Sequence, residues 1–437
     1  DVSRALKWGV EHVDAVEIDP VIAQLGTKHH PDKPYSDPRV TLHLDDGRNF
    51  LRAAPEKKYD LVVYALVDSL VLHSSYSNIR LESYLFTQQA FQDIKRCLKP
   101  NGVFAMYNFF RQGWVVTRIQ RGLSEVFEQP PIALSLPYKK SIKPDESMEN
   151  SRTVFLSGDV DHIRKKFDND KLYWLESKPA TKDTPNGFET TPPAGMEKKW
   201  IRFGPMSIEK SSESIRLAED DWPFLYLRKP TIPAHILRGL LIMGGIALAM
   251  ILFFIPRGEK QPGRWHLSGR MFFLGAGFML IETKAVVHMA LLFGSTWIVN
   301  TVVFFAVLVM ILLANLFVLK SNPQKLWPYY LGLFVALLLN VIVPLDAFLG
   351  MNRTLQVIGG CLLTFTPILF AGVIFAVSFK RTRFPDLAFG ANIAGAMMGG
   401  LAESTSMLLG FRYLVLVAMG LYLLSMFTTK SKVAEES

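Results

Sequence analysis

Long apolar runs fill the second half of this chain and constrain its fold more than any other feature. A helix needs about 20 mostly apolar residues to cross the hydrocarbon core of a bilayer. Residues 1–233 are mixed and charged, and runs of this length begin only after them. The runs lie near residues 235–255, 270–293, 297–319, 327–348, 355–379, 386–409 and 412–428. We therefore predict a soluble region followed by an all-α transmembrane bundle of about seven helices, of which the last two runs could form one broken span.

The soluble region alternates short apolar runs with helical patterns. The continuous run "YDLVVYAL", residues 59–66, is typical of a strand buried on both faces of a parallel sheet. Similar runs occur at residues 13–18, 40–44, 103–109 and 153–158. This order predicts an α/β doubly wound, mostly parallel sheet over residues 1–170. Ligands of such sheets bind at the carboxyl ends of the strands.

The first of these strands ends in two carboxylates, Glu17 and Asp19. In nucleotide-binding α/β folds, an acidic residue at the end of the second strand binds ribose hydroxyls, about 20 residues after a glycine-rich turn on the first strand. Only a helical segment, residues 2–9, precedes the strand in this chain. We therefore predict a fragment that lacks the first strand. A gap or a compensating shift should then interrupt the sheet.

Composition divides the chain into four predicted segments. These are a sheet domain at 1–170, an irregular extension that leads into the membrane at 171–233, a transmembrane domain at 234–428 and a polar tail at 429–437. In the extension, Trp222, Phe224 and Tyr226 suit the membrane interface, and they could also pack on the sheet domain. Cys97 and Cys361 lie in different domains, so no disulfide is expected.

The formal net charge of +9 lies largely in short loops between the apolar runs. Cationic loops that face anionic lipid explain this charge, and a nucleic-acid role would need a basic face with interleaved aromatic residues. We therefore expect a lipid bilayer as partner and no nucleic acid. The basic loops alternate with charge-poor loops, which places them on the cytoplasmic side. With seven spans the soluble domain would lie on the opposite side, and a count that differs by one would reverse this.

Two features of the apolar half go beyond simple spans. "GANIAGAMMGG" places Gly395 and Gly399 four residues apart on one helix face, a spacing that lets helix backbones approach closely. Charged groups inside spans are costly and are candidates for function. They are Glu282, Lys284, His288 and Glu403. Two alternatives stay open: a polar site for a cationic or amphiphilic ligand, or pairs across helices that lock the bundle.

An ordered set of motifs carries a family resemblance. "VEIDP", "DPRVTLHLDDGRNFL", "YDLVV" and "ESYLFTQQAFQDIKRCLKPNGVF" resemble, in this order, the spermidine synthase family of aminopropyltransferases. The resemblance covers roughly residues 1–115 and implies the class I S-adenosylmethionine methyltransferase fold, which is Rossmann-like. With the apolar runs, "RLESYLFT" is similar to a bacterial branch in which such a domain is fused to a multi-pass membrane region. That branch implies the bacterial inner, cytoplasmic membrane.

The resemblance implies roles for four residues. Glu17 would bind the ribose hydroxyls of S-adenosylmethionine or its decarboxylated form, because a carboxylate accepts two hydrogen bonds from a vicinal diol. Asp46 would accept from the adenine amino group, and Asp19 and Gly47 complete the two motifs. The alternatives are a surface carboxylate for Glu17 and a turn-forming residue for Asp46. No metal is expected.

The chain departs from the family at the catalytic base. Alignment from Tyr59 and Asp60 places Ala65 where the family has the Asp that deprotonates the attacking amine, and Asp68 at the second acidic position. An amine is protonated at neutral pH and must lose a proton before it attacks. Asp68 is the candidate replacement, or it could hold the ammonium group or cap a helix. Tyr64 and Glu82 are the other polar candidates.

The function hypotheses therefore belong to different classes. The first is a membrane-anchored transferase that uses S-adenosylmethionine or its decarboxylated form and transfers an aminopropyl group to a small-molecule amine, with methyl transfer as a variant. The second is a catalytically degenerate nucleoside-sensing domain on a membrane transport or binding protein. The third is a scaffold with neither activity. The sequence leaves the oligomeric state and the substrate open.

Overall fold

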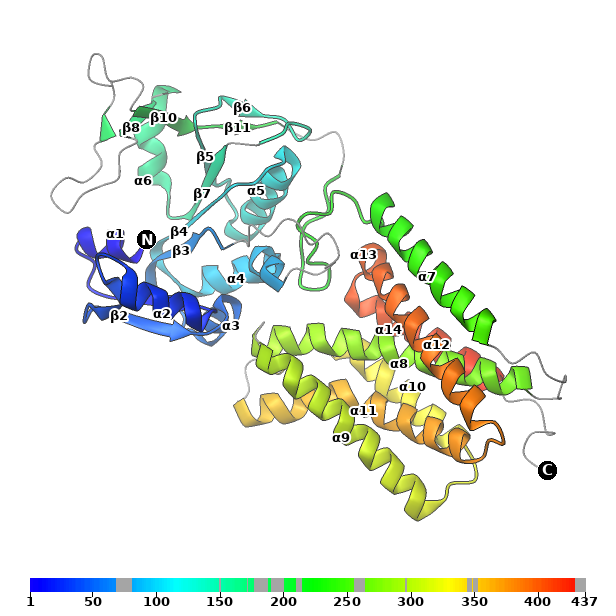
Figure 1. The fold of residues 1–437 in the computed structure, drawn as a ribbon. Helices are drawn as coiled ribbons and strands as arrows, with labels where there is room; N and C mark the ends of the chain where they lie inside the picture. Colours follow the sequence, from blue (N-terminus) through cyan, green and yellow to red (C-terminus); the bar gives the residue numbers. More distant parts are fainter. Residues whose placement is uncertain are drawn as a thin grey trace. The chain divides into compact units, whose positions relative to one another are not determined.

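The computed structural model describes residues 1–67, 81–148, 151–170, 172–176, 188–189, 200–209, 214–254, 264–294, 297–343, 348 and 353–428. The chain divides into two compact units, Asp1–Lys229 and Pro230–Ser437. Figure 1 shows strands and helices in the first unit and helices in the second. Asp68 and the side chain of Glu82 lie outside the described residues.

Strands and helices alternate through the first half of the first unit, as predicted. The helices are α1 (Val2–Lys7), α2 (Pro20–His29), α3 (Gly47–Ala53), α4 (Gln88–Cys97), α5 (Gly113–Phe127) and α6 (Asp161–Arg164). The main strands are β1 (Val13–Glu17), β2 (Val40–Leu44), β3 (Tyr59–Ala65), β4 (Leu98–Asn108), β5 (Ile132–Leu136), β7 (Arg152–Gly158), β8 (Tyr173–Glu176) and β10 (Trp200–Pro205). Short strands are β6 (Ser141–Ile142), β9 (Phe188–Glu189) and β11 (Ser207–Ile208).

Side-chain caps fix where three helices begin. Asp19, Asp46 and Thr87 each precede a helix and accept hydrogen bonds from backbone N–H groups of its first turn. These N–H groups have no partner within the helix, so a cap oxygen stabilises the helix by about 1 kcal/mol. The first turns of α2 and α3 therefore start directly at the carboxyl ends of β1 and β2.

The strands form a mixed sheet, where a mostly parallel one was predicted, and the sheet is interrupted as predicted. β1 pairs with β2 in a separate parallel sheet, whereas the larger sheet has the order β3-β4-β7-β5-β10-β8-β9. Within the described strands, β1 does not pair with β3, so the predicted gap is confirmed; that the chain is a fragment stays a prediction. β3 and β4 are parallel, and β4, β7 and β5 pair antiparallel. A parallel return needs a crossover of a dozen or more residues, usually a helix, and the described residues between β5 and β7 contain no helix.

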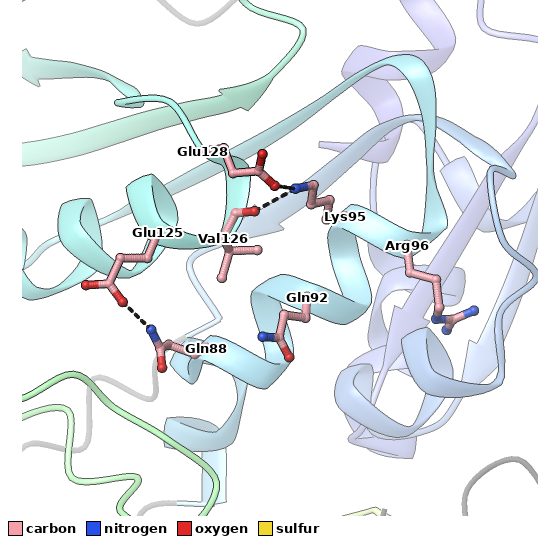
Figure 2. A pocket seen from close by; sticks show the side chains of 7 residues that line it. All are labelled: Gln88, Gln92, Lys95, Arg96, Glu125, Val126 and Glu128. Carbon is pink, nitrogen blue, oxygen red and sulfur yellow. Dashed lines mark hydrogen bonds and ion pairs between the residues drawn. The ribbon is translucent and has the colours of Figure 1, made fainter.

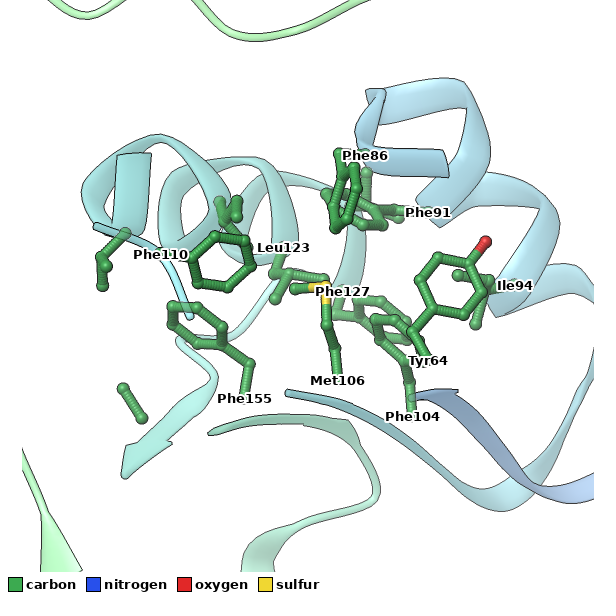
Figure 3. Close-up of a cluster of buried hydrophobic side chains, with 14 of the residues drawn as sticks. Tyr64, Phe86, Phe91, Ile94, Phe104, Met106, Phe110, Leu123, Phe127 and Phe155 are labelled. Atoms are coloured by element: carbon green, nitrogen blue, oxygen red, sulfur yellow. The ribbon is translucent and has the colours of Figure 1, made fainter. Parts of the chain in front are cut away.

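The core of the first unit lies between the larger sheet and helices α4 and α5. Figure 3 shows aromatic side chains of the strands facing those of the helices. Phe104 and Phe155 of the sheet and Phe91 and Leu123 of the helices are at most 1% exposed. This packing fixes β3 and β4, whose carboxyl ends lie side by side; in the sequence, Asp68 follows the last residue of β3 by three positions.

The segment expected to be irregular, 171–233, contributes to the first unit. β10 pairs antiparallel with β5 and β8, so it extends the sheet. Trp222, Phe224 and Leu225 are buried, and Leu225 belongs to the core of the first unit, in agreement with the alternative that this segment packs on the sheet domain. The role at the membrane interface stays a prediction. Trp200, Ile201 and Phe203 of β10 are residue types that favour strands. Residues 200–203 pair with β8, and Gly204 and Pro205 pair with β5.

Asp14 bridges the gap between the two sheets. It lies on β1, and its carboxylate accepts hydrogen bonds from Lys58 Nζ (2.7 Å) and Tyr59 Oη (2.8 Å) at the start of β3. His43 Nε2 of β2 and His12 Nε2 lie 2.9 and 3.2 Å from Oδ1. Burial alone would raise the pKa of Asp14, but these hydrogen bonds outweigh it and hold the pKa well below its usual value.

Replacing Asp14 with Asn should loosen the small sheet. The folded-state pKa lies below the unfolded value of about 3.9, so this stabilisation is present above about pH 4 and is lost as the pH falls. At pH 7 we expect Asp14→Asn to lower the opening free energy of β1 and β2 by about 1–3 kcal/mol. Hydrogen exchange of these strands in the intact protein measures it. Asp60→Asn is the control, since Asp60 forms an exposed ion pair with Lys99; equal effects of both variants would contradict the prediction.

The second unit consists of helices in its described residues. They are α7 (Ala234–Phe254), α8 (Arg264–Phe293), α9 (Trp297–Ser321), α10 (Trp327–Ile342), α11 (Arg353–Lys380), α12 (Pro385–Ala402), α13 (Ser406–Leu409) and α14 (Phe411–Phe427). Among the described residues, three stretches are long and apolar enough to cross a membrane, by length and composition: Ser268–Leu292, Thr301–Ser321 and Thr354–Lys380. Gly410 has a φ of 93° and separates α13 from α14. It lies between the last two predicted runs, 386–409 and 412–428.

The predicted close approach at the small residues of α12 is confirmed. A Cβ atom added at Gly395 would overlap the backbone carbonyl of Phe272, and one added at Gly399 would overlap that of Ala276. On the facing helix α8, a Cβ at Gly275 would overlap the carbonyl of Asn392. The two helices therefore pack backbone against backbone, which only residues without a side chain permit.

Candidate functional site

The predicted carboxylates meet at one edge of the small parallel sheet. Glu17 is the last residue of β1 and is paired in register with Leu44, the last residue of β2. Asp45 follows, and its backbone N–H donates to the carbonyl of Glu17 over 3.2 Å. Because the strands are parallel and adjacent, Glu17 and the pair Asp45–Asp46 lie at the same carboxyl edge. In α/β sheets this edge is where ligands bind.

Glu17 is held by the turn that follows β1. Its Oε1 accepts a hydrogen bond from the backbone N–H of Asp19 (3.0 Å). Among the described residues, its side chain makes no other hydrogen bond, and it is half-buried. Tyr35 lies near Glu17. Burial, and then the negative charge of Glu17, raise the pKa of the Tyr35 hydroxyl. Glu17 is therefore oriented by the backbone and keeps acceptor capacity for a further donor.

Asp19 and Asp46 both cap helices. Asp19 Oδ1 accepts from Val21 N (2.7 Å) at the start of α2. Asp46 is buried, and its Oδ1 accepts from Arg48 N (2.8 Å) and Asn49 N (3.1 Å). The turn-forming role considered for Asp46 is therefore present in the structure. It also fixes the orientation of the carboxylate at the N-terminus of α3, next to Gly47.

The strand end expected to carry a base has no acidic residue within the described part. Ala65 ends β3, and Asp68 lies outside the described residues. Tyr64 is 5% exposed, and its ring packs edge-on against Phe104 in the core. Burial raises the pKa of Tyr64. A buried phenol with a raised pKa cannot remove a proton from an amine, so Tyr64 is a core residue rather than a base.

A buried ion network that includes two arginines of α3 was not predicted. Asp220 Oδ2 is 3.0 Å from Arg48 Nη2 and 2.9 Å from Arg52 Nη2. Asp93 Oδ2 is 3.0 Å from Arg48 Nη1. Thr87 Oγ1 donates to the other oxygen of Asp220 (2.6 Å). The spacing of Arg48 and Arg52 on one helix face could have indicated a shared partner, but no local pattern points to residue 220.

Arg118 of α5 forms a second unpredicted anchor and is 2% exposed. Its guanidinium donates to five backbone carbonyls: Nε to Arg216 (2.7 Å), Nη1 to Phe224 (3.1 Å) and Leu225, and Nη2 to Leu227 (2.8 Å) and Arg228 (3.2 Å). The rings of Trp114 and Trp222 lie 5.0 and 5.4 Å from its guanidinium carbon. Burial, and then Arg216, lower the pKa of Arg118 to about 9, so it stays charged at neutral pH.

The pocket between α4 and α5 does not involve the candidate binding residues Glu17, Asp19, Asp46 and Gly47. It has a volume of about 580 Å³, and Figure 2 shows its polar side chains. Gln88 Nε2 donates to Glu125 Oε2 (2.7 Å), and Lys95 Nζ donates to Glu128 Oε1 (2.7 Å). These groups bind one another across the pocket, so the arrangement indicates helix-to-helix contacts rather than a ligand site.

The predicted membrane charges lie on α8 and directly after α12, two helices that pack against each other. Lys284 is buried, and His288 follows one turn later on the same face of α8. Glu282 lies on a different face of α8, and Glu403 follows the last residue of α12. Both alternatives for these groups, a polar site and a lock between helices, stay predictions. Within the described residues, no group of three or more His, Cys, Asp or Glu side chains is placed to hold a metal ion.

Known proteins resemble the first unit in sequence. Residues 2–139 match the profile of the Spermine/spermidine synthase domain. Spermidine synthase 1 of Pisum sativum is 38% identical over 96 residues, which are 22% of this chain and 26% of that protein. A polyamine aminopropyltransferase of Pectobacterium carotovorum is 33% identical over 111 residues, 25% of this chain and 34% of that protein. The crystal structure of spermidine synthase from Thermotoga maritima is 20% identical, covers 39% of this chain and 53% of that chain, and gives a TM-score of 0.28.

The N-terminal part of the chain is therefore similar to the Spermine/spermidine synthase domain over residues 2–139. The chain spans only 26% and 34% of the length of the two curated relatives. Because the TM-score is low, the assignment rests on the sequence matches. They confirm the predicted resemblance for this domain.

Proposed function

We propose that this chain is part of a membrane-anchored transferase of the spermidine synthase type. It would use S-adenosylmethionine or its decarboxylated form and transfer an aminopropyl group to a small-molecule amine. One observation carries the proposal: Glu17 and Asp46 follow adjacent parallel strands, at the edge where α/β sheets bind ligands. The matches of residues 2–139 support the same class.

The donors and acceptors of the site fit a nucleoside. Glu17 would accept hydrogen bonds from the ribose hydroxyls, and Asp46 would accept one from the adenine amino group. Asp19 and Gly47 border these positions, and a Cβ at Gly47 would meet only the side chain of Leu85 at 3.5 Å. The space beside Gly47 therefore lets a flat base approach the backbone.

Asp68 is the proposed base for aminopropyl transfer. The attacking amine nitrogen bonds to the aminopropyl carbon next to the sulfonium sulfur, and the carbon–sulfur bond breaks with its electron pair left on sulfur. The proton released by the amine passes to the Asp68 carboxylate. Since Ala65 cannot accept a proton, this carboxylate replaces the family base, and turnover should be slower than in the family.

The second unit supports anchoring in a membrane. Three apolar stretches have the length and composition of membrane-spanning helices, and shorter apolar helices accompany them. We propose a multi-pass protein of the bacterial inner membrane, with the lipid bilayer as its partner. The side on which the first unit lies depends on the number of spans.

A second candidate is a nucleoside sensor on a transport or binding protein. Ala65 at the base position favours it, because binding needs Glu17 and Asp46 but no base. Two assays separate the candidates in the full-length protein. The enzyme forms a product from labelled decarboxylated S-adenosylmethionine and a diamine, whereas the sensor forms none and alters flux of polyamines or nucleosides into liposomes.

Removing the Glu17 carboxylate should weaken nucleoside binding in the full-length protein. Hydrogen bonds to a charged group contribute about 1.5–3 kcal/mol, so Glu17→Ala should weaken binding of 5′-methylthioadenosine about 10- to 150-fold. Calorimetry measures the affinity. Glu11→Ala is the control, because Glu11 is exposed and precedes β1. No binding to the unmodified protein at millimolar ligand would refute the proposed function.

A further inference from the structure

A strap of residues 214–229 closes the first unit and precedes the apolar helix α7. Ile215, Ala218, Trp222 and Leu225 of the strap are at most 3% exposed. The backbone of the strap is also bound to α4, since Gln88 N donates to the carbonyl of Ala218 (2.9 Å). The strap is therefore a packed part of the first unit, with Asp220 at its centre.

The Asp220 carboxylate is an ion-paired and nearly buried charge within the first unit. Its side chain is 13% exposed, and those of Arg48 and Arg52 are 4% and 8% exposed. The backbone N–H of Asp220 donates to Gln89 Oε1 (3.0 Å), which fixes the turn that presents the carboxylate. Two guanidinium groups thus share the carboxylates of Asp220 and Asp93. Neutralising Asp220 would leave an excess of buried positive charge.

Arg48 connects this network to the candidate site. Its backbone N–H donates to Asp46 Oδ1 (2.8 Å), while its side chain pairs with Asp220 (3.0 Å). Arg52, one turn further along α3, pairs with the same carboxylate (2.9 Å). Asp220 therefore holds one face of α3, and the first turn of α3 orients the Asp46 carboxylate.

We propose that Asp220 is a positioning residue for nucleoside recognition. Through Arg48 and Arg52 it fixes the first turn of α3, and so sets the direction in which Asp46 meets the adenine amino group. The inference rests on the proposed function and deepens it. It also means that the segment leading to the apolar helices completes the site, although it lies more than 160 residues from Asp46 in the chain.

The discriminating readout is the preference for adenine over hypoxanthine. Hypoxanthine has a carbonyl where adenine has its amino group, so a correctly placed Asp46 favours 5′-methylthioadenosine over 5′-methylthioinosine. Loss of a hydrogen bond to a charged group lowers affinity about 10- to 150-fold. In the full-length protein, Asp220→Asn should weaken 5′-methylthioadenosine binding about 10- to 100-fold. The ratio of the affinities for 5′-methylthioadenosine and 5′-methylthioinosine should then fall close to one. General destabilisation would lower both affinities and leave their ratio unchanged.

Matched variants make the experiment specific. Glu219→Gln removes the same charge from the neighbouring strap residue and should retain the preference of the unmodified protein. In an Asp46→Asn background, Asp220→Asn should change binding less than about twofold, since both act on one contact. If Asp220→Asn alone fails to fold, Asp220→Asn with Arg52→Gln restores the charge balance and should still lose the preference.

The outcomes separate the two proposals. If the unmodified protein binds neither nucleoside, the proposed function fails and the inference falls with it. If the unmodified protein prefers adenine and Asp220→Asn keeps that preference, only the inference is overturned. Additive losses from Asp46→Asn and Asp220→Asn would also overturn it, because they would show that Asp220 acts independently of Asp46.

Discussion

Arg118→Met should lower the free energy of unfolding of the first unit by about 3–5 kcal/mol, a large share of the stability of a typical domain. Arg118 donates to five carbonyls of the strap, and methionine fills similar space but offers no donor. Each buried carbonyl left without a partner costs about 1–3 kcal/mol, and partial entry of water offsets part of the sum.

Tryptophan fluorescence can follow this loss, because Trp114 and Trp222 flank the guanidinium group. Denaturant unfolding of the solubilised protein should show an earlier transition for the variant. Arg121→Met on the same helix is the control: Arg121 is exposed and donates to one strap carbonyl, that of Ile215 (3.0 Å). A change in the free energy of unfolding of less than about 1 kcal/mol for Arg118→Met would show that the strap does not depend on the hydrogen bonds of Arg118.

Gly395→Leu should prevent the native packing of α8 against α12. Even a Cβ atom at this position would overlap the backbone carbonyl of Phe272, and backbone cannot rotate away as a side chain can. Gly399 and Gly275 belong to the same backbone contact between α8 and α12. The helices would therefore have to separate along the whole contact. We expect a cost of at least about 3 kcal/mol, the upper end of the usual range for over-packing.

Gly390→Leu on the same helix provides a matched control. A Cβ at Gly390 meets nothing within 4 Å, so the same added side chain has open space there. In detergent, the Gly395 variant should lose its thermal unfolding transition or shift it far downward, while the Gly390 variant should unfold near the temperature of the unmodified protein. Equal behaviour of the two variants would contradict the backbone contact between α8 and α12.

The candidate site was predictable in part, because its two carboxylates stand at the ends of apolar runs. Parallel strands that are neighbours in a sheet bring their carboxyl ends together, so Glu17 and Asp46 could be expected at one edge. The helix caps made by Asp19 and Asp46 follow from the same local positions. The roles of Arg48 and Arg52 could not be predicted, because the partner that they share lies on a strap far along the chain.

The sequence by itself determined the division into a charged sheet domain and an apolar helical region, and the small-residue face of α12. These features depend on run length, period and the spacing of neighbours, which a linear chain displays directly. Tertiary structure alone decided the antiparallel half of the sheet, the bridge that Asp14 forms to β3, and the anchoring of the strap by Arg118 and Asp220. Arg118 and its first strap partner are 98 residues apart, and Asp220 and Arg48 are 172 apart. Contacts at such separations have no period in the sequence, because they exist only once packing has removed the groups from water and each buried donor needs an acceptor.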